Sequence, residues 1–157
     1  MAKKINYFIV WGFVLIALLL TLWANHSFVS KKKRDIEIQK MIEKEFQTLK
    51  NDMIQIIGAS ENRDSSLLKL ITNFNISNRN VFMMKVNGDI IFHHNLSNTN
   101  LFSYLDARGN AVYKKMAELR NGAVRYQDKN KPGFVMSYFY TEPQLKWVLI
   151  LEASYLY

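Results

Sequence analysis

The sequence predicts an α+β protein with one N-terminal transmembrane helix, a long helix after it, and an antiparallel sheet of about five strands with short helices. A single membrane-length apolar run spans Ile5 to Trp23, and no second run of this kind follows it. Apolar residues then recur at helical spacing over roughly 25 residues. Beyond Arg79, short β-rich runs are separated by turn signals, which is typical of antiparallel strands.

The apolar run from Ile5 to Trp23 contains only three residues that are not apolar. As a helix it covers roughly 28 Å, close to the thickness of a hydrocarbon core. A cleaved signal peptide is the alternative, but its apolar core is usually only about 7 to 15 residues long, and Leu22-Trp23-Ala24 is a poor cleavage site. Trp23 also suits a membrane interface. We therefore predict an uncleaved membrane anchor.

The formal net charge of +8 suggests nucleic acid at first, but the positions of the basic residues argue against it. Six of the 21 basic residues flank the apolar run, namely Lys3, Lys4, Lys31, Lys32, Lys33 and Arg34. The other 15 face 13 acidic residues, which leaves a net charge of +2 and an ordinary solvated surface. A basic cluster next to an apolar run favours contact with lipid headgroups. We predict membrane association through residues 5–23 and no nucleic-acid partner.

Residues 1–34 form the predicted anchor with its basic juxtamembrane segment, and residues 35–157 form one water-soluble domain. Its roughly 120 residues are enough to bury a hydrophobic core. Charge leaves the side of the membrane open, because the basic residues after the run prefer the cytoplasm. That preference weakens when a long domain is translocated, and Asp35 and Glu37 follow the basic cluster closely.

A long helix is predicted over residues 35–60. Its apolar residues follow one another at intervals of three or four, as expected for one stripe on a helix: Ile38, Ile42, Phe46, Leu49, Met53 and Ile56. Two interpretations are equally open. The stripe packs on the domain's own sheet, or it pairs with a second copy and makes a homodimer. A shorter helical segment follows from about Ser66.

The sheet is predicted over residues 79–157, and it begins with a hairpin. Val81–Val86 and Ile90–His94 flank Asn87-Gly88-Asp89, and Asn-Gly between two β-rich runs is a strong hairpin signal. A polar loop follows. A short helix is then predicted over Ala111–Arg120, with Asn121-Gly122 as its C-terminal cap.

Three further strands complete the predicted sheet. Ala123–Gln127 and Phe134–Tyr140 form a hairpin across the turn at Asp128 to Gly133, and Lys146–Ala153 is the last strand. Helix, two strands, helix and three antiparallel strands is the order of a PAS-like sensor sheet.

Several short motifs, in this order and at this spacing, resemble the single Cache domain, which is the periplasmic sensor of many bacterial chemoreceptors and sensor kinases. The resemblance covers roughly residues 35 to 157. The chain differs from the usual pattern at Val135, where Lys is common, at Asn95, where Pro often stands, and in a shorter loop from His94 to Asp106. The matching segments are Asn87-Gly88-Asp89-Ile90-Ile91-Phe92-His93-His94, Leu105-Asp106-Ala107-Arg108-Gly109, Tyr113, Tyr126, Ser137-Tyr138 and Trp147-Val148.

Five residues are candidates for ligand binding: His94, Arg108, Tyr113, Tyr126 and Tyr138. The tyrosines would present hydroxyls to a ligand, or they fill the core or a dimer face. Arg108, in a turn before a helix, would neutralise an anion, or it is simply solvated. The resemblance implies that His94 faces the pocket. Because adjacent strand residues point to opposite faces, His94 and its neighbour cannot share a metal ion.

Sequence signatures of catalysis are missing. The chain has no phosphate loop, nucleophile elbow or helical His pair, and the absence of Cys excludes thiol catalysis and thiolate metal sites. We therefore predict no enzyme activity, no catalytic residue, no metal and no cofactor.

The predicted function, which follows from the resemblance and the apolar run, is small-molecule sensing for signal transduction. The domain would lie outside the cytoplasm on a single-pass anchor in a bacterial inner membrane, as an input module of a chemoreceptor or sensor kinase. The ligand class stays open and includes carboxylates and amino acids. The alternative is a single-pass accessory or assembly subunit that does not bind a ligand. The chain is expected to be either the front part of a longer receptor or a stand-alone protein.

Overall fold

The computed structural model describes residues 7–59, 62–74, 79–93, 99–130 and 132–155, with the backbone alone for residues 7–10 and 155. The chain divides into two units, residues 1–41 and 42–157. The first helix, α1 (Tyr7–Gly58), contributes residues to both units. The boundary predicted between residues 34 and 35 stays a prediction.

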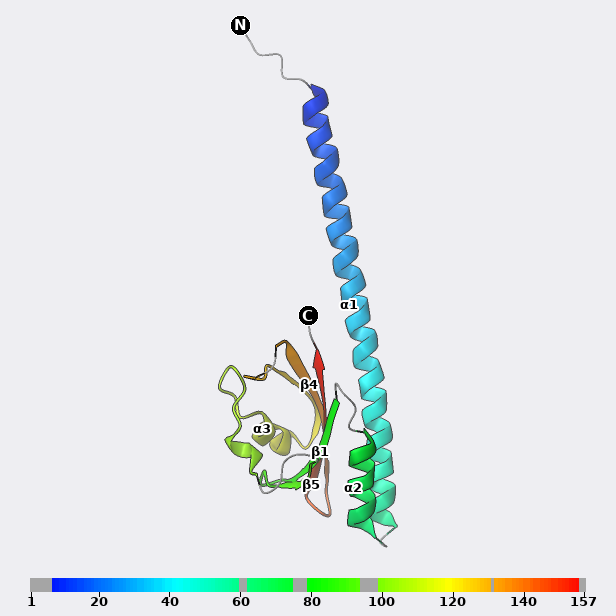
Figure 1. Cartoon of the computed structure of the whole chain (residues 1–157), viewed down its shortest axis with the longest axis vertical. Coiled ribbons are helices and arrows are strands. Elements are labelled where there is room, and N and C mark those ends of the chain that lie inside the picture. The colour runs from blue at the N-terminus through cyan, green and yellow to red at the C-terminus, as the bar shows by residue number, and fades with distance from the viewer. Residues whose placement is uncertain (1–6, 60–61, 75–78, 94–98, 131, 156–157) are drawn as a thin grey trace. The chain divides into compact units, whose positions relative to one another are not determined.

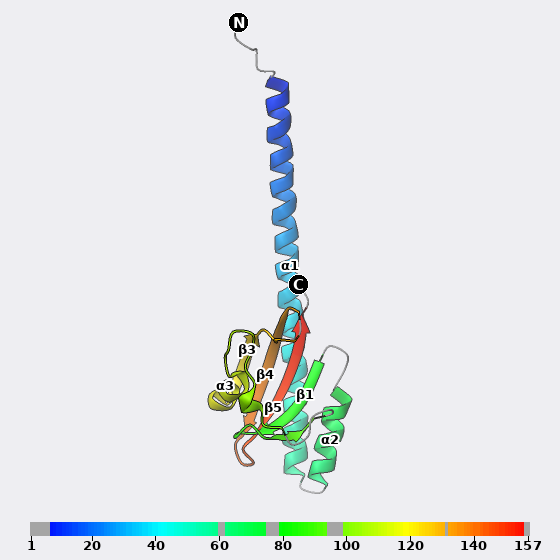
Figure 2. The same ribbon diagram turned by 60° about the vertical axis from the view of Figure 1, so that its left-hand side comes forward.

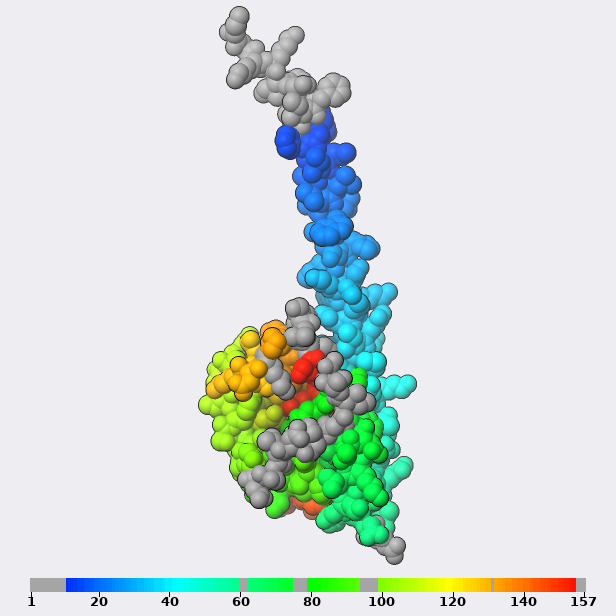
Figure 3. Space-filling model, in the orientation of Figure 1, coloured from blue at the N-terminus to red at the C-terminus, as the bar shows by residue number. Residues whose placement is uncertain are grey.

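The first unit contains the N-terminal part of α1, shown in blue (Figure 3). Among the described residues, α1 is the one helix long and apolar enough, by length and composition, to cross a membrane. In the part of α1 that belongs to this unit, large apolar side chains are exposed, with Trp11 at 70% and Trp23 at 71%. The Thr21 hydroxyl donates to the carbonyls of Ala17 (3.0 Å) and Leu18 (2.8 Å). A polar group satisfied within its own helix suits a hydrocarbon environment.

The second unit is built on a five-stranded antiparallel sheet (Figure 1). Its spatial order is β2-β1-β5-β4-β3, which places β5 at the centre. The strands are β1 (Arg79–Lys85), β2 (Ile90–Phe92), β3 (Asn121–Tyr126), β4 (Phe134–Glu142) and β5 (Trp147–Tyr155). The other elements are α2 (Arg63–Phe74), the 3-10 turn η1 (Leu101–Ser103) and α3 (Val112–Leu119). The predicted α+β class, long helix and sheet are therefore confirmed.

The sheet separates two hydrophobic clusters, because successive side chains of a strand point to opposite faces. Figure 2 shows α3 and α2 on opposite sides of the sheet. One face, here called the helix face, packs against α2 and residues 42–58 of α1. The opposite face, here called the α3 face, is covered by α3 and η1. The helix-face cluster comprises Ile42, Phe46, Leu49, Met53, Leu67, Ile71, Val81, Met83, Leu149, Leu151 and Ala153. The α3-face cluster comprises Phe82, Met84, Leu101, Val112, Tyr113, Met116, Tyr126, Val135, Phe139, Val148 and Ile150.

The apolar stripe of α1 is largely accounted for within the second unit. Its central residues, Ile42 to Met53, are buried against the helix face of the sheet. The first interpretation, packing on the domain's own sheet, therefore holds for these residues. Pairing with a second copy stays a prediction.

The cap of α3 differs from the prediction. The left-handed residue is Arg120 (φ 64°), whose N–H donates to the carbonyl of Met116 at 3.1 Å. Asn121 and Gly122 instead begin β3, where they pair with Tyr140 and Phe139. The Arg120 carbonyl accepts the N–H of Thr141 at 2.6 Å, so β4 holds the turn in place of a glycine cap.

The predicted hairpin at Asn87-Gly88 is confirmed, although β2 ends at Phe92. The Lys85 N–H donates to the carbonyl of Asp89 at 2.8 Å and closes the turn. Gly88 has φ 93°, and a Cβ there would lie 2.5 Å from the Phe102 ring. Glycine is therefore required both by the backbone conformation and by the close approach of η1.

Replacing Leu49 with Ala tests the packing of α1 on the sheet. Leu49 is fully buried, so truncation should lower the free energy of unfolding by about 2 to 5 kcal/mol. Ile54→Ala is the matched control on the same helix, since Ile54 is 42% exposed and should cost no more than about 0.5 kcal/mol. Denaturant unfolding of the full chain in detergent measures both. Equal losses would contradict this packing.

Candidate functional site

Three polar residues form a row across the α3 face, in the middle of the sheet. In the strand registers, Glu152 of β5 pairs with Asn80 of β1 on one side and with Ser137 of β4 on the other. Residues paired across antiparallel strands point to the same face. The alternation of β5, with Val148, Ile150 and Glu152 on one face, therefore brings one carboxylate into an otherwise apolar layer.

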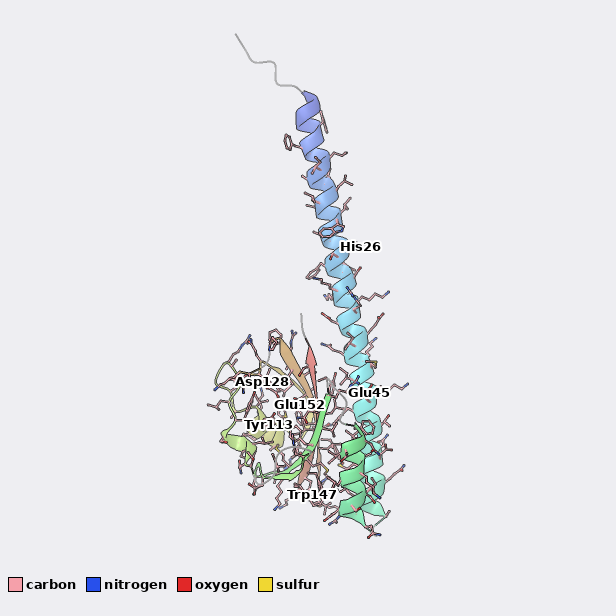
Figure 4. All side chains as sticks on the ribbon, in the orientation of Figure 1. His26, Glu45, Tyr113, Asp128, Trp147 and Glu152 are labelled. Carbon is pink, nitrogen blue, oxygen red and sulfur yellow. The ribbon has the colours of Figure 1, made fainter. Side chains whose placement is uncertain are left out.

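The Glu152 carboxylate is held by hydrogen bonds from four side chains. Its Oε1 accepts the hydroxyls of Tyr126 (2.7 Å), Tyr113 (2.8 Å) and Ser137 (3.3 Å). Its Oε2 accepts the Asn80 amide at 3.3 Å. Glu152 is only 7% exposed, so these donors replace most of its water. Figure 4 shows Tyr113 and Glu152 in the same region of the second unit.

The two tyrosines reach Glu152 from different elements. Tyr113 lies in the first turn of α3, and Tyr126 is the last residue of β3. Their hydroxyl oxygens are 3.2 Å apart, and Tyr104 stacks near both rings, with centroids 5.3 Å from Tyr113 and 6.2 Å from Tyr126. The three rings and the carboxylate make one polar-aromatic cluster, here called the Glu152 cluster: Asn80, Tyr104, Tyr113, Tyr126, Ser137 and Glu152.

All three tyrosines of the cluster are held in the neutral form. Burial, followed by the negative charge of Glu152, raises the pKa of Tyr113 and of Tyr126 well above the ordinary value. Burial and, after it, the negative charge of Asp128 raise the pKa of Tyr104 to about 12. At neutral pH Tyr113 and Tyr126 are therefore hydrogen-bond donors to the carboxylate, whereas the Tyr104 hydroxyl is buried without a hydrogen-bond partner among the described residues.

No cation neutralises Glu152 within the described residues. The ion pairs found there are Arg63 with Asp64 (3.2 Å) and Arg79 with Glu45 (2.8 Å). A buried carboxylate held only by neutral donors is costly for folding, since desolvation of the charge is not offset by a counter-charge. Such a group is a candidate for function.

A cavity of about 340 Å³ adjoins the cluster at Tyr126. The Asp106 carboxylate accepts the N–H groups of Arg108 (2.9 Å) and Asn110 (2.8 Å), which shapes the turn at its edge. Hydrogen bonds from Asn110 hold the pKa of Asp106 below its usual range. Arg125 stacks on Phe134, with the guanidinium 4.1 Å from the ring centroid. The lining residues are Asp106, Arg108, Asn110, Arg125, Tyr126, Gln127 and Phe134.

The structure brings three of the five predicted ligand-binding residues to this region. Tyr113 and Tyr126 meet at Glu152, and Arg108 lines the cavity that Tyr126 also lines. Tyr138 lies on the helix face instead, with its ring 5.9 Å from that of Phe46. Burial, followed by the charge of Glu43, raises the pKa of Tyr138. Tyr138 therefore does not join the other tyrosines, because it alternates with Ser137 on β4.

His94 lies outside the described residues. Its neighbour His93 is described, and its ring centroid is 5.4 Å from that of Phe82, a member of the α3-face cluster. His93 therefore belongs to the α3 face.

Sequence reasoning missed Glu152, Asn80 and Tyr104. Glu152 had a detectable signal, because it is the one charged residue in a strand whose other α3-face positions are apolar. Asn80 could be found only from the register of β1 with β5, since the two residues are 72 positions apart. Tyr104 gives no such pattern, because it follows a 3-10 turn outside any strand.

Several solved structures have a fold similar to that of this chain. A Cache chemosensory domain described for carboxylic acid recognition has a TM-score of 0.57 and 22% identity, over 69% of this chain and 86% of that one. A methyl-accepting chemotaxis protein from Vibrio parahaemolyticus has a TM-score of 0.53 and 16% identity, over 74% of this chain and 92% of that one. A periplasmic sensor domain of a chemotaxis protein has a TM-score of 0.57 and 12% identity, over 78% of this chain and 95% of that one.

The domain has the fold of a single Cache, PAS-like sensor domain. The resemblance expected from the sequence motifs is thus confirmed at the level of the fold. No family model matches the chain, and no curated protein matches it.

Replacing Tyr126 with Phe tests the hydrogen bonding of the cluster. At pH 7 the free energy of unfolding should fall by about 1 to 3 kcal/mol, because the buried carboxylate loses one donor. Above about pH 10, unfolded tyrosines ionise, whereas Tyr126 in the folded state keeps its proton because its pKa is raised. The unfolded state then binds fewer protons, so stability falls as the pH rises.

The Tyr126→Phe variant should therefore lose less stability between pH 10 and 11 than the wild type, by about 1 kcal/mol. Urea unfolding of the full chain at pH 7, 10 and 11 measures both effects. A variant as stable as the wild type at pH 7, with an unchanged alkaline slope, would contradict the burial and bonding of this hydroxyl.

Proposed function

We propose that this chain is the input domain of a membrane-anchored sensor, and that it binds a small molecule at the Glu152 cluster and the adjoining cavity. The observation that carries the proposal is the buried carboxylate itself. Its hydrogen-bond donors come from four elements, and they converge on the face of the sheet that α3 covers. The resemblance of the fold to chemosensory domains supports the same assignment.

The strands offer a physical connection between the site and α1. Asn80 bonds Glu152 on the α3 face, and the preceding residue, Arg79, forms an ion pair with Glu45 of α1 at 2.8 Å. On β5, Leu151 and Ala153 flank Glu152 and belong to the helix-face cluster. A shift of β1 or β5 at the site would therefore displace the residues of α1 that contact these strands in the second unit.

The proposed mechanism is a shift between two packings of α1. A ligand changes this balance only by the difference of its affinities for the two packings. The output would be a rotation or small axial step of the helix, passed to the predicted membrane segment and to a second copy of the chain in the proposed homodimer.

We also place the domain outside the cytoplasm of a bacterial cell, on a single-pass anchor formed by residues 5–23. The exposed apolar side chains of α1 support the anchor. Chemotaxis sensor domains of similar fold, one of them described as periplasmic, support the side of the membrane.

Alkaline phosphatase fused after Tyr157 tests the location, since this enzyme is active only outside the cytoplasm. We expect an active fusion in intact bacteria. A fluorescent protein at the same position, which folds in the cytoplasm, is the control and should give little signal. The reverse pattern would place the domain in the cytoplasm, as the basic cluster after the apolar run prefers.

A thermal-unfolding screen of the full chain in detergent micelles tests ligand binding. The panel contains small carboxylates, amino acids, amines and purines. A specific ligand at a hundred times its dissociation constant should stabilise the folded state by about 2.7 kcal/mol, which is a clear rise in Tm. Tyr113→Phe should reduce this rise, because it removes a donor to Glu152.

Tyr140→Phe is the matched control, because Tyr140 is half-buried on the helix face of the same sheet. Its ligand-induced rise in Tm should equal that of the wild type. A folded protein that responds to no compound in the panel would overturn the sensor proposal and favour an accessory or assembly subunit.

A further inference from the structure

The two oxygens of Glu152 are not bonded equally. Oε1 accepts three hydroxyls, two of them within 2.8 Å. Oε2 accepts a single amide at 3.3 Å, which is a long hydrogen bond. A carboxylate oxygen has room for about two donors. Oε2 is thus the part of the carboxylate that the protein leaves incompletely satisfied.

A second acceptor lies beside it. The Asn80 amide donates to Oε2 through its nitrogen, and its oxygen Oδ1 is buried without a hydrogen-bond partner among the described residues. Asn80 and Glu152 are directly paired across β1 and β5. A buried acceptor without a donor is rare and costs stability. Two adjacent oxygens on the same face are therefore incompletely satisfied, since Oε2 has one long hydrogen bond and Oδ1 has none.

We propose that the site binds a primary ammonium group, which donates to Glu152 Oε2 and Asn80 Oδ1. An ammonium has three N–H donors and no acceptor, so it meets both unsatisfied oxygens. Its positive charge supplies the counter-charge that the described residues do not give to Glu152. The assignment rests on the proposed function and deepens it by naming the ligand class.

The aromatic rings suit the same ligand. Tyr104, Tyr113 and Tyr126 lie with centroids 5.3 to 6.4 Å apart in tilted or edge-to-face pairs. Aromatic rings stabilise a cation that lies over their faces, so this neighbourhood favours a positive group over a negative one. A free carboxylate ligand is disfavoured, since it would meet the negative charge of Glu152 at short range.

The cavity beside Tyr126 is lined by neither of the two acceptors, because Tyr126 of β3 and Asn80 of β1 lie on opposite sides of Glu152 in the sheet. Its lining contains Asp106 as well as Arg108 and Arg125, so it presents charges of both signs. The assignment therefore concerns the ammonium group and not its substituent. The shared chemistry is a primary ammonium on a monoamine or on a small amino acid.

Thermal unfolding and calorimetric titration of the full chain in detergent at pH 7 test this assignment with four probes: ethylammonium, alanine, tetramethylammonium and acetate. We expect a rise in Tm with ethylammonium, alanine or both, and none with tetramethylammonium, which has the charge but no N–H donor. Ethylammonium alone identifies a monoamine, and alanine alone an amino acid. Acetate alone would overturn the ammonium assignment and leave the sensor proposal standing. No response to these probes would overturn this assignment, and no response to the wider panel as well would overturn both.

Two variants locate the binding atoms. Glu152→Gln keeps the shape and removes the charge, and it should weaken binding of the active probe at least tenfold. Asn80→Ala keeps the charge and removes the second acceptor, and it should weaken binding several-fold even if the first variant does not fold. Glu142→Gln is the matched control, because Glu142 is also buried but accepts the Leu145 N–H in the turn between β4 and β5. Equal binding by the wild type and Asn80→Ala would overturn the assignment.

Discussion

The buried carboxylate of Glu152 is the constraint around which the second unit is organised. It lies on β5, the central strand, and it receives donors from β1, β3, β4 and α3. Each donor offsets part of the cost of burying the charge, so the loss of one donor lowers stability. The hydrogen bonds of Tyr113 and Tyr126 to Glu152 thus fix the position of α3 over the sheet and the end of β3.

The same strand joins the site to the helices. On β5, Leu151 and Ala153 are the neighbours of Glu152 in sequence and pack on the helix face. On β1, Arg79 precedes Asn80 and forms an ion pair with Glu45 of α1. Because a sheet this well packed does not deform freely, a change in hydrogen bonding at Glu152 has to be taken up by both faces. One small domain can therefore contain a binding site on one face of the sheet and transmit a displacement to the helices on the other face.

The fold could be predicted from the sequence because its signals are local. The stripe of α1, the Asn87-Gly88 turn and the alternating strands each depend on spacings of a few residues. The predicted cap of α3 was wrong, because Arg120 takes the left-handed conformation and its carbonyl accepts a hydrogen bond from β4. This hydrogen bond is a tertiary contact. The site was predicted only in part. Tyr113 and Tyr126 lie together at Glu152, as candidates for one site. The face on which Tyr138 lies and the hydrogen bond of Asn80 to Glu152 depend on strand register, which the sequence does not give.

Val135 shows why a missing residue is a weak guide to a lost function. In the resemblance to Cache domains, its position commonly holds a Lys. The absence of that cation suggests that a carboxylate-binding site has lost its function. Here Val135 is buried in the α3-face cluster, directly paired with Tyr126, and the charge of the site comes from Glu152 two strands from Tyr126. Val135 therefore provides no cation, and the buried charged side chain of this cluster is the acidic Glu152. The hydroxyls of Tyr113, Tyr126 and Ser137 are already engaged with this carboxylate, which has no counter-charge among the described residues.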